Sequence, residues 1–290
     1  MTKIISGNTI ANNILNNIKT DLINYNVKPK LGIIILGDNP ASLLYIKKKR
    51  EAATKIGINI VIKNLDISSS EQTIINAIEI MNNDKLINGI IVQLPLPPTL
   101  NEEKILNTIS YYKDVDGFHT KNIGNLALNN RNPLFIPCTA LSCLHIFETL
   151  NIDLKGKNIV IIGKSNIVGL PLMLALLKKD ATVTVCHIET LNIKEHTKCA
   201  NILISACGNP EMIKKDWIKD DAIIIDVGIN YISDNSDNSD PSKKKLVGDV
   251  DINDVKEKVS YITPVPYGVG PITVAILMSN TFKAFKLQNS

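Results

Sequence analysis

Residues 157–169, KNIVIIGKSNIVG, carry the clearest indication of the fold class. It joins an apolar run of strand composition to a turn that starts at Gly163, and a helical pattern over 167–179 follows directly. A strand, a glycine turn and a helix in this order form the entry to a nucleotide-binding half, where backbone N–H groups meet a pyrophosphate. Because Ser165 stands where GxGxxG has its second glycine, a plain αβ turn fits the pattern about as well.

Strand patterns alternate with helical patterns on both sides of this stretch, which predicts an α/β protein with parallel sheets covered by helices. The expected strands cover 31–37, 59–66, 89–98, 157–164, 181–187, 201–208 and 221–230, and the expected helices cover 42–57, 71–83, 137–150, 167–179 and 270–286. A length of 290 residues is near the ceiling of one core, so we expect two αβ domains flanking a cleft. The expected domains are 1–137 with 271–290, and a Rossmann-like domain over 138–270, joined by the two long helices at 137–150 and 270–286.

Composition and charge exclude several other classes of protein. A hydrophobic content of 44% and a net charge of +4 describe a globular chain, and no apolar run approaches the roughly 18 residues of a membrane span. With 4% aromatic residues and two arginines, the chain lacks the basic and aromatic pattern of a nucleic-acid-binding protein. Five cysteines without a CxxC pair are typical of reduced thiols, so we expect a cytoplasmic protein without a metal site. The polar segment 232–245 is expected to be an exposed, mobile loop.

Polar side chains at four places are candidates for chemistry, and each also has a plain structural explanation. Tyr45 and Lys49 are four residues apart on one predicted helix, which is also the spacing of a surface pair. Gln93 ends a predicted strand, where ligands of open α/β sheets bind, yet polar residues often end strands. The turn 113–118, KDVDGF, holds two carboxylates but could be an Asx-type loop, and the Pro- and Gly-rich loop 263–273 could be a hinge.

Eight motifs taken together, in order along nearly the whole chain, resemble the bifunctional methylenetetrahydrofolate dehydrogenase/methenyltetrahydrofolate cyclohydrolase family. The motifs are Tyr45-x-x-x-Lys49, VQLPLP at 92–97, KDVDGF at 113–118, IPCT at 136–139, GKSNIVG at 163–169, DVGIN at 226–230, VGDVD at 247–251 and TPVPYGVGPIT at 263–273. The resemblance implies a catalytic domain and a Rossmann-like cofactor domain with a folate cleft between them. It also implies a homodimer and tetrahydrofolate derivatives as substrates.

The resemblance further implies which residues act. Lys49 would be the catalytic lysine, Gln93 its hydrogen-bonding partner, Tyr45 a stacking surface for the folate ring and Asp116 the anchor of the pterin N–H groups. The implied substrate contacts are Tyr45, Lys49, Val92, Gln93, Leu94, Asp116, Pro266, Gly268, Val269, Gly270, Pro271 and Thr273. The implied cofactor contacts are Gly163, Lys164, Ser165, Ile188, Ile229 and Thr139.

The implied chemistry is oxidation of 5,10-methylenetetrahydrofolate to the methenyl cation with NADP, followed by hydrolysis to 10-formyltetrahydrofolate in one-carbon metabolism. Hydrolysis needs a proton shuttle, and Lys49 suits it as a base or as an electrostatic orienter of water if its pKa is lowered. Lys164 and His187 favour NADP as the cofactor, while Glu189 leaves NAD as the second choice. Tyr267 replaces a glycine of the family's loop.

Two other functions remain as alternatives. A generic NAD(P)-dependent dehydrogenase of another small substrate would explain the second half of the chain, but it leaves Lys49, Gln93 and Asp116 without a role. A folate- or nucleotide-binding protein without turnover would tolerate the loss of Lys49, yet this lysine is present.

Overall fold

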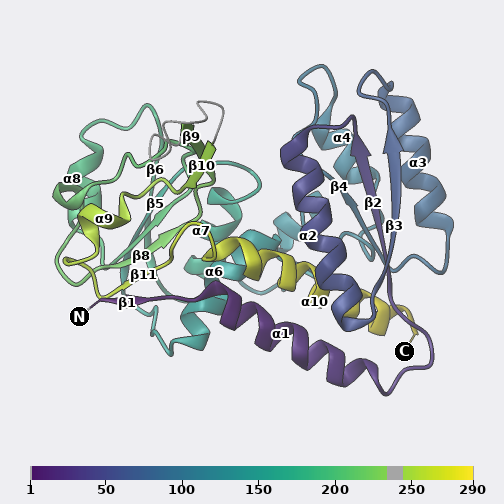
Figure 1. Ribbon diagram of the computed structural model, residues 1–290, viewed down its shortest axis with the longest axis horizontal. Helices are drawn as coiled ribbons and strands as arrows, with labels where there is room; N and C mark the ends of the chain where they lie inside the picture. The colour runs from purple at the N-terminus through teal and green to yellow at the C-terminus, as the bar shows by residue number, and fades with distance from the viewer. Residues whose placement is uncertain (1, 234–243, 290) are drawn as a thin grey trace. The chain divides into compact units, whose positions relative to one another are not determined.

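The computed structural model describes residues 2–233 and 244–289 (Figure 1). The chain forms two compact units, and each is built from separate stretches of sequence. Unit 1 comprises Met1–Ile10 and Thr139–Thr273, and unit 2 comprises Ala11–Cys138 and Val274–Ser290. The chain passes from one unit to the other within or at the start of three helices, which are α1 (Gly7–Leu22), α6 (Cys138–Thr149) and α10 (Val269–Asn289). The sequence predicted α6 and α10 but not α1.

Unit 2 holds a parallel sheet of three strands, in the order β3-β2-β4, as the alternating pattern predicted. The strands are β2 (Lys30–Leu36), β3 (Asn59–Leu65) and β4 (Gly89–Val92), and the helices of this unit include α2 (Pro40–Ile56), α3 (Glu71–Asn83), α4 (Glu102–Thr108) and α5 (Thr120–Ala127). Buried residues of α3 and α4 pack on the sheet face that carries Ile34 and Ile90. This packing leaves the carboxyl ends of β2 and β4 at one edge of the sheet.

Helix α2 carries two of the candidate residues, and the local sequence fixes both of its ends. The Asn39 side chain accepts hydrogen bonds from the N–H groups of Ala41 and Ser42, and Pro40 occupies the first turn. Gly57 ends the helix with φ of 88°, in the left-handed conformation typical of a C-cap glycine. The sequence had predicted this helix over 42–57.

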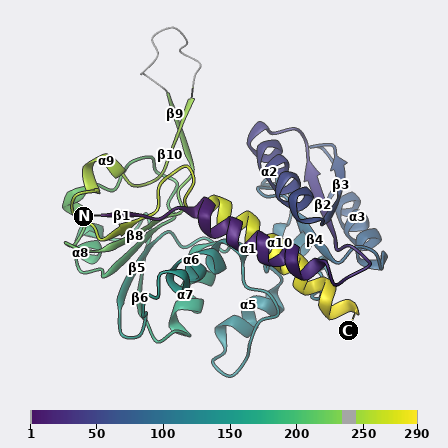
Figure 2. The same cartoon turned by 60° about the horizontal axis from the view of Figure 1, so that its bottom comes forward.

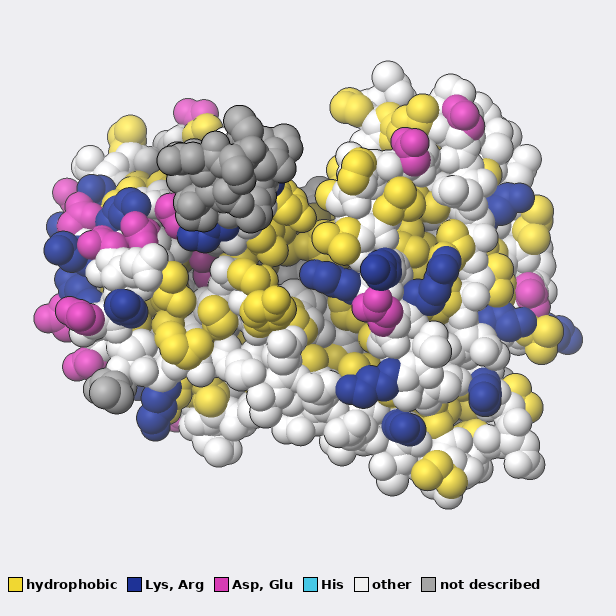
Figure 3. All heavy atoms as spheres, viewed as in Figure 1, with side chains coloured by type: hydrophobic (Ala, Val, Ile, Leu, Met, Phe, Trp, Pro, Cys, Tyr) yellow, Lys and Arg dark blue, Asp and Glu magenta, His cyan; other side chains and the backbone are white. Residues whose placement is uncertain are grey.

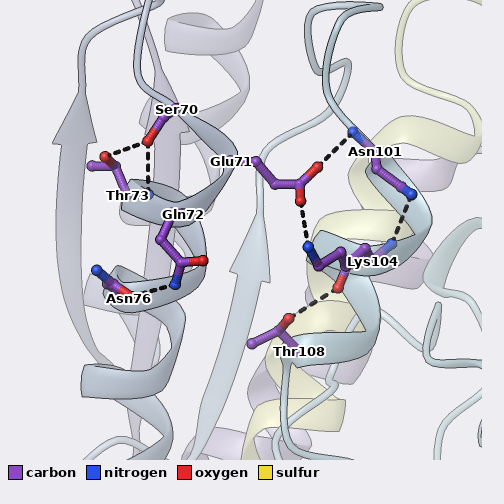
Figure 4. A network of polar contacts seen from close by, with 8 residues as sticks. All are labelled: Ser70, Glu71, Gln72, Thr73, Asn76, Asn101, Lys104 and Thr108. Atoms are coloured by element: carbon purple, nitrogen blue, oxygen red, sulfur yellow. Dashed lines mark hydrogen bonds and ion pairs between the residues drawn. The ribbon is translucent and has the colours of Figure 1, made fainter.

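The start of α3 is linked to the start of α4 by polar contacts at the surface of unit 2 (Figure 4). Ser70 caps α3, and the neighbouring Glu71 carboxylate accepts hydrogen bonds from the Lys104 ammonium at 2.7 Å and from the Asn101 N–H at 3.2 Å. Ion pairs as exposed as this one contribute little to stability.

Unit 1 holds a parallel sheet of six strands in the order β1-β11-β8-β7-β5-β6. The strands are β1 (Lys3–Ile4), β5 (Asn158–Ile162), β6 (Thr182–Cys186), β7 (Ile202–Ser205), β8 (Ile223–Asp226) and β11 (Tyr261–Ile262). Helices α7 (Gly169–Leu177), α8 (Ile193–Lys198) and α9 (Ile252–Val255), with a short 3-10 helix over Lys215–Trp217, connect them. The strand order changes direction beside β5, so the carboxyl ends of β5 and β7 flank the position where α/β sheets bind nucleotides. The two parallel sheets confirm the predicted α/β fold class.

Three details of unit 1 differ from the prediction. Helix α7 begins at Gly169 and not at Ile167. The expected strand 221–230 is broken, because the Asp226 carboxylate accepts the Gly228 N–H and turns the chain away from the sheet. The chain then continues as the antiparallel hairpin of β9 (Asn230–Ser233) and β10 (Lys244–Val247), which stands apart from the six-stranded sheet in Figure 2. Both ends of the expected loop 232–245 are therefore strands, and its centre, 234–243, lies outside the described residues.

Within the described part of the chain, a search for helices of bilayer-spanning length and hydropathy finds none.

Candidate active site

Lys49 and Gln93 are brought together in unit 2 by α2 and by the end of β4. The Lys49 Nζ donates a hydrogen bond of 2.9 Å to the Gln93 Oε1. The amide of Gln93 is itself held, since its Nε2 donates to the Leu94 carbonyl oxygen at 2.8 Å and its backbone N–H to Ile34 at 2.8 Å. The prediction that these two residues are partners therefore agrees with the geometry of the unit.

The environment of Lys49 differs from that of the rest of the basic run 47–50. Lys47, Lys48 and Arg50 are exposed, and Figure 3 shows lysine and arginine side chains at the surface of unit 2 around α2. Lys49 is half-buried, and this desolvation lowers the pKa of its ammonium, while the nearby Asp116 carboxylate opposes the shift. A lysine with a lowered pKa can hold or release a proton closer to neutral pH than a surface lysine can.

Tyr45 lies on α2 one turn before Lys49 and is half-buried. The Lys48 ammonium lies 6.0 Å from the centroid of its ring. Its predicted role as a stacking surface stays a prediction, since the ring's function depends on a ligand.

The first two charged residues of the turn 113–118, Lys113 and Asp114, make hydrogen bonds that stabilise the local fold. The buried Lys113 ammonium donates to the carbonyl oxygens of Met81, Asn82 and Asp84 at 2.8–3.1 Å, which satisfies the C-terminal end of α3. The buried Asp114 carboxylate accepts the backbone N–H groups of residues 117, 118 and 119 and the Asn122 side-chain amide. Burial raises the pKa of Asp114 to about 7, against the effect of these donors.

The second carboxylate of the turn, Asp116, lies close enough to Lys49 to interact with its ammonium. It is half-buried, it attracts the Lys49 ammonium electrostatically, and it forms a hydrogen bond with the Cys138 thiol. The sequence could not show which of the two carboxylates builds the turn and which one is available for a ligand.

Cys138 and Asn280 complete this cluster, although neither was among the predicted site residues. The Cys138 thiol is buried 3.4 Å from the Val115 carbonyl oxygen, and burial together with Asp116 raises its pKa well above the usual range. The buried Asn280 Nδ2 donates to the Val115 carbonyl oxygen at 2.8 Å and to the Cys138 Sγ at 3.6 Å. The signal for Cys138 was its place in the IPCT motif, whereas Asn280 lies in the middle of α10, outside every motif.

Two other predicted substrate contacts lie beside Gln93. Val92 is buried at the end of β4, and Leu94 is half-buried and precedes Pro95 in a cis peptide bond. Val92 therefore contributes its backbone and not an exposed side chain to this edge of the sheet.

The turn after β5 in unit 1 has the features of a phosphate-binding loop. Gly163 adopts φ of 117°, and a Cβ at this position would overlap the Ala206 carbonyl oxygen, so only glycine fits. The Ser165 Oγ accepts the Val168 N–H at 3.2 Å at the start of α7. The exposed amides of residues 164–167 make no hydrogen bond within the described structure, so they are available to an anion. The turn thus fits a dinucleotide pyrophosphate.

The other predicted cofactor contacts differ in exposure. Lys164 is exposed next to Gly163, Ile188 is 95% exposed after β6, Ile229 is 43% exposed after β8, and Thr139 is half-buried at the start of α6. An isoleucine as exposed as Ile188 has no packing role in its own unit. The adjacent His187 Nδ1 accepts the Glu189 N–H at 3.3 Å, which fixes the turn that carries Glu189.

The loop 263–273 lies in unit 1 and holds the remaining predicted substrate contacts. Gly268 and Val269 are buried, whereas Pro266, Gly270, Pro271 and Thr273 are half-buried. Tyr267 is 63% exposed and adopts φ of 78°, a conformation that favours glycine. The Tyr267 carbonyl oxygen accepts the Gly7 N–H at 2.9 Å, which ties the loop to the start of α1.

Among residues 2–233 and 244–289, no three His, Cys, Asp or Glu side chains gather as metal ligands.

Two family models match the chain in succession. Residues 5–116 match the family model of the tetrahydrofolate dehydrogenase/cyclohydrolase catalytic domain, and residues 137–289 match that of its NAD(P)-binding domain. A bifunctional protein FolD from Rickettsia bellii is 46% identical over 291 residues, which are 99% of each chain.

Solved structures give the same answer. The FolD methylenetetrahydrofolate dehydrogenase/cyclohydrolase of Campylobacter jejuni superposes with a TM-score of 0.92 at 39% identity, covering 99% of both chains. The Trypanosoma brucei enzyme, which was crystallised with NADP and an inhibitor, superposes with a TM-score of 0.93 at 33% identity, covering 99% of this chain and 98% of the other. The chain therefore belongs to the tetrahydrofolate dehydrogenase/cyclohydrolase family, and it is a bifunctional methylenetetrahydrofolate dehydrogenase and methenyltetrahydrofolate cyclohydrolase of one-carbon folate metabolism.

Proposed function

We propose that the chain oxidises 5,10-methylenetetrahydrofolate with NADP and then hydrolyses the methenyl product to 10-formyltetrahydrofolate, with Lys49 as the residue that handles the proton. The observation that carries this proposal is the 2.9 Å hydrogen bond between Lys49 and Gln93 beside Asp116. A generic dehydrogenase would need neither a half-buried lysine such as Lys49 nor a hydrogen-bonded partner such as Gln93 at the end of β4.

NADP would lie on unit 1, with its pyrophosphate at the exposed amides that follow Gly163 and its 2′-phosphate near Lys164. When bound, its nicotinamide supplies the acceptor for the hydride of the methylene carbon. That carbon is flanked by two nitrogens, so the residues of the chain need only align the reactants and stabilise charge.

Lys49 would act in the hydrolysis step, where water adds to the methenyl carbon and a proton must leave. In its neutral form, which the lowered pKa favours, the amine donates one hydrogen to Gln93 and can accept a proton from water with its lone pair. In its charged form it would orient the water electrostatically. Both roles require Gln93 to fix the direction of the Nζ atom.

Asp116 would bind the pterin. An ionised carboxylate can accept two N–H groups from the donor edge of the ring, and such charge-assisted bonds are stronger than neutral ones. The Cys138 thiol forms a hydrogen bond with this carboxylate, and the Asn280 side-chain amide donates a hydrogen bond to the Cys138 sulfur. These two contacts position the Asp116 side chain. Tyr45 would stack on the folate ring from α2.

The remaining assignments are predictions that rest on the family. Folate binding is assigned to 1–137 with 271–290 and dinucleotide binding to 138–270, and we expect a homodimer in the cytoplasm. The N-terminal residues Met1–Ile10 form part of unit 1, so the strand that they supply is proposed to support the dinucleotide side.

The test is to mix the protein with methylenetetrahydrofolate and either NADP or NAD and to record reduced nicotinamide and methenyl absorbance. We expect both signals, with the methenyl signal decaying as hydrolysis proceeds and NADP the better cofactor. Absence of both signals with either dinucleotide would contradict the proposal. Hydride transfer without methenyl hydrolysis would restrict it to the dehydrogenase.

A further inference from the structure

Asp249, the third residue of the VGDVD motif, has a fully buried carboxylate and no role in the function described above. It accepts six hydrogen bonds inside unit 1. The donors are the Ser205 Oγ at 2.9 Å, the Cys207 N–H at 2.8 Å, the Cys207 Sγ at 3.3 Å, the Gly208 N–H at 3.3 Å, the Asn209 N–H at 3.1 Å and the Asn230 Nδ2 at 2.8 Å.

These donors come from two different loops at the carboxyl edge of the parallel sheet. Ser205 ends β7 and residues 206–209 follow it, whereas Asn230 lies at the end of the turn that follows β8. The loop after β7 also touches the phosphate-binding turn, since the Ala206 carbonyl oxygen occupies the space that a Cβ of Gly163 would need. One carboxylate thus joins both loops, and the first of them lies against the turn that would hold the pyrophosphate.

A second buried carboxylate fixes Asp249 itself. Asp226 ends β8, and its Oδ1 accepts the Asp249 N–H at 3.1 Å and the Gly228 N–H at 2.9 Å, while its Oδ2 accepts the Val250 N–H at 2.9 Å. Gly228 packs so closely on the Asp249 carboxylate that a Cβ would overlap it. The loop after β8 therefore requires glycine at position 228, because any side chain there would overlap the Asp249 carboxylate.

Burying a carboxylate is unfavourable unless its oxygens are hydrogen-bonded, and here three consecutive backbone amides of one loop provide half of the six bonds. These bonds restrict the backbone positions of the loops, and a site that aligns a hydride donor with its acceptor requires fixed positions. In a Rossmann-like sheet the adenosine half of a dinucleotide lies over the first strand and its neighbour, here β5 and β6, and the other half lies over the following strands, here β7 and β8.

We propose that Asp249 is a positioning residue for the nicotinamide half of the dinucleotide, acting through the loops 206–209 and 227–230 that it holds. The inference rests on the proposed use of NADP and deepens it. Asp249 itself would not contact the cofactor. Its hydrogen bonds determine the backbone positions of these two loops. The loops in turn align the nicotinamide for hydride transfer.

The main variant is Asp249→Asn, which keeps the size of the side chain but turns one acceptor oxygen into an NH2 group that faces N–H donors. Because a misalignment of about 1 Å can cost about 10²-fold in rate, we expect the dehydrogenase kcat to fall by roughly that factor. We expect cyclohydrolase activity, which needs no dinucleotide, and the affinity for adenosine 2′,5′-bisphosphate, which lacks the nicotinamide half, to stay within about twofold of wild type.

A second variant, Asn230→Ala, removes only the bond from the loop after β8 and keeps the test informative if Asp249→Asn does not fold. It should lower the dehydrogenase kcat in the same selective way but by less. Asp220→Asn is the matched control, since this aspartate has a side chain that is 84% exposed, precedes the opposite end of β8 and pairs with Lys258 at the surface. It should leave every activity unchanged.

Two results would overturn the inference. An unchanged dehydrogenase kcat in both variants would show that the loops need no such anchor. An equal loss of kcat, cyclohydrolase activity and affinity for adenosine 2′,5′-bisphosphate would show that the Asp249 carboxylate maintains the unit as a whole. Dehydrogenase rates are measured with NADP and with NAD. The wild-type rates test the proposed function, whereas the ratio of each variant's rate to the wild-type rate tests the role of Asp249.

Discussion

The Lys49 ammonium and the Gln93 side-chain amide are joined by a 2.9 Å hydrogen bond across 44 residues of sequence. The bond links the middle of α2 to the residue that follows β4, so the fold of unit 2 must be complete before it can form. A lysine held by a neutral amide keeps its direction in both protonation states, because Gln93 can accept a hydrogen from an amine or from an ammonium.

The first prediction concerns this lysine. In Lys49→Met, cyclohydrolase activity should fall by about 10²- to 10⁴-fold, which is typical of a lost acid-base group. The hydrolysis of methenyltetrahydrofolate, followed by its absorbance, measures the loss directly. Lys47→Met is the control, since Lys47 is exposed on the same helix and should be dispensable. Full hydrolysis by the Lys49 variant would remove this residue from the mechanism.

The second prediction concerns pH. Asp116 attracts the Lys49 ammonium and so keeps its pKa from falling further. In Asp116→Asn this attraction is lost, the pKa of Lys49 falls, and the neutral amine persists to lower pH. If the neutral amine is the base, the acidic limb of the pH profile of the hydrolytic kcat should shift to lower pH. The exposed Asp21 provides the control Asp21→Asn, and a shift to higher pH would exclude the proposed base.

The third prediction separates the two ligands. Asp116→Ala should weaken folate binding and leave dinucleotide binding unchanged, because its carboxylate belongs to unit 2 and the phosphate-binding turn to unit 1. Calorimetric titration with each ligand measures both affinities in one protein. A fall of the dinucleotide affinity as large as that of the folate affinity would contradict the assignment of this turn to the substrate.

The fourth prediction concerns the choice of cofactor. A charge-assisted bond from Lys164 to a 2′-phosphate contributes about 1.5–3 kcal/mol, and its exposure favours the lower figure, which corresponds to about a tenfold preference in kcat/KM for NADP over NAD. Lys164→Ala should erode this preference with little effect on NAD turnover, and Glu189→Gln should sharpen it. Unchanged selectivity in the Lys164 variant would show that this turn contacts only the pyrophosphate.

The fifth prediction concerns backbone strain at Tyr267, whose φ of 78° is unusual for an aromatic residue. Glycine tolerates this conformation and alanine does not, so Tyr267→Gly should be more stable than Tyr267→Ala by about 1 kcal/mol. Comparing the two variants cancels the loss of the ring. Chemical denaturation followed by tryptophan fluorescence can measure it, because Trp217, the single tryptophan, lies in unit 1. An alanine variant as stable as the glycine variant would show that the loop relaxes.

The sequence predicted most of the regular structure, for physical reasons that particular elements show. Strand β5 and helix α2 are local in origin, since an apolar run, a capping asparagine and a C-cap glycine suffice to define them. Helix α1 was missed because its asparagine-rich sequence has weak helix propensity and buries its apolar face only in the tertiary structure. The end of the expected strand 221–230 was misjudged because the Asp226 carboxylate, which turns the chain there, also accepts the N–H groups of Asp249 and Val250, more than 20 residues away.

The candidate site divides in the same way. Lys49, Gln93 and Asp116 could be named from motifs, but the different uses of Asp114 and Asp116 could not, since only the folded turn shows which carboxylate accepts the amides of residues 117–119. Cys138 and Asn280 are adjacent only through packing between distant segments. Asp249 lies within a motif, yet its six donors come from residues that periodicity cannot bring together.

Strand β1 has a consequence for how the protein is made. Its two residues pair in parallel with Tyr261 and Ile262, so this strand leaves the ribosome well before β11 and cannot pair with it until translation has passed Ile262. A fragment that began at Thr139 would lack this strand and would expose the edge of β11, which invites pairing with other chains. An excised dinucleotide-binding half should therefore aggregate, unless the first ten residues are grafted back or supplied as a peptide.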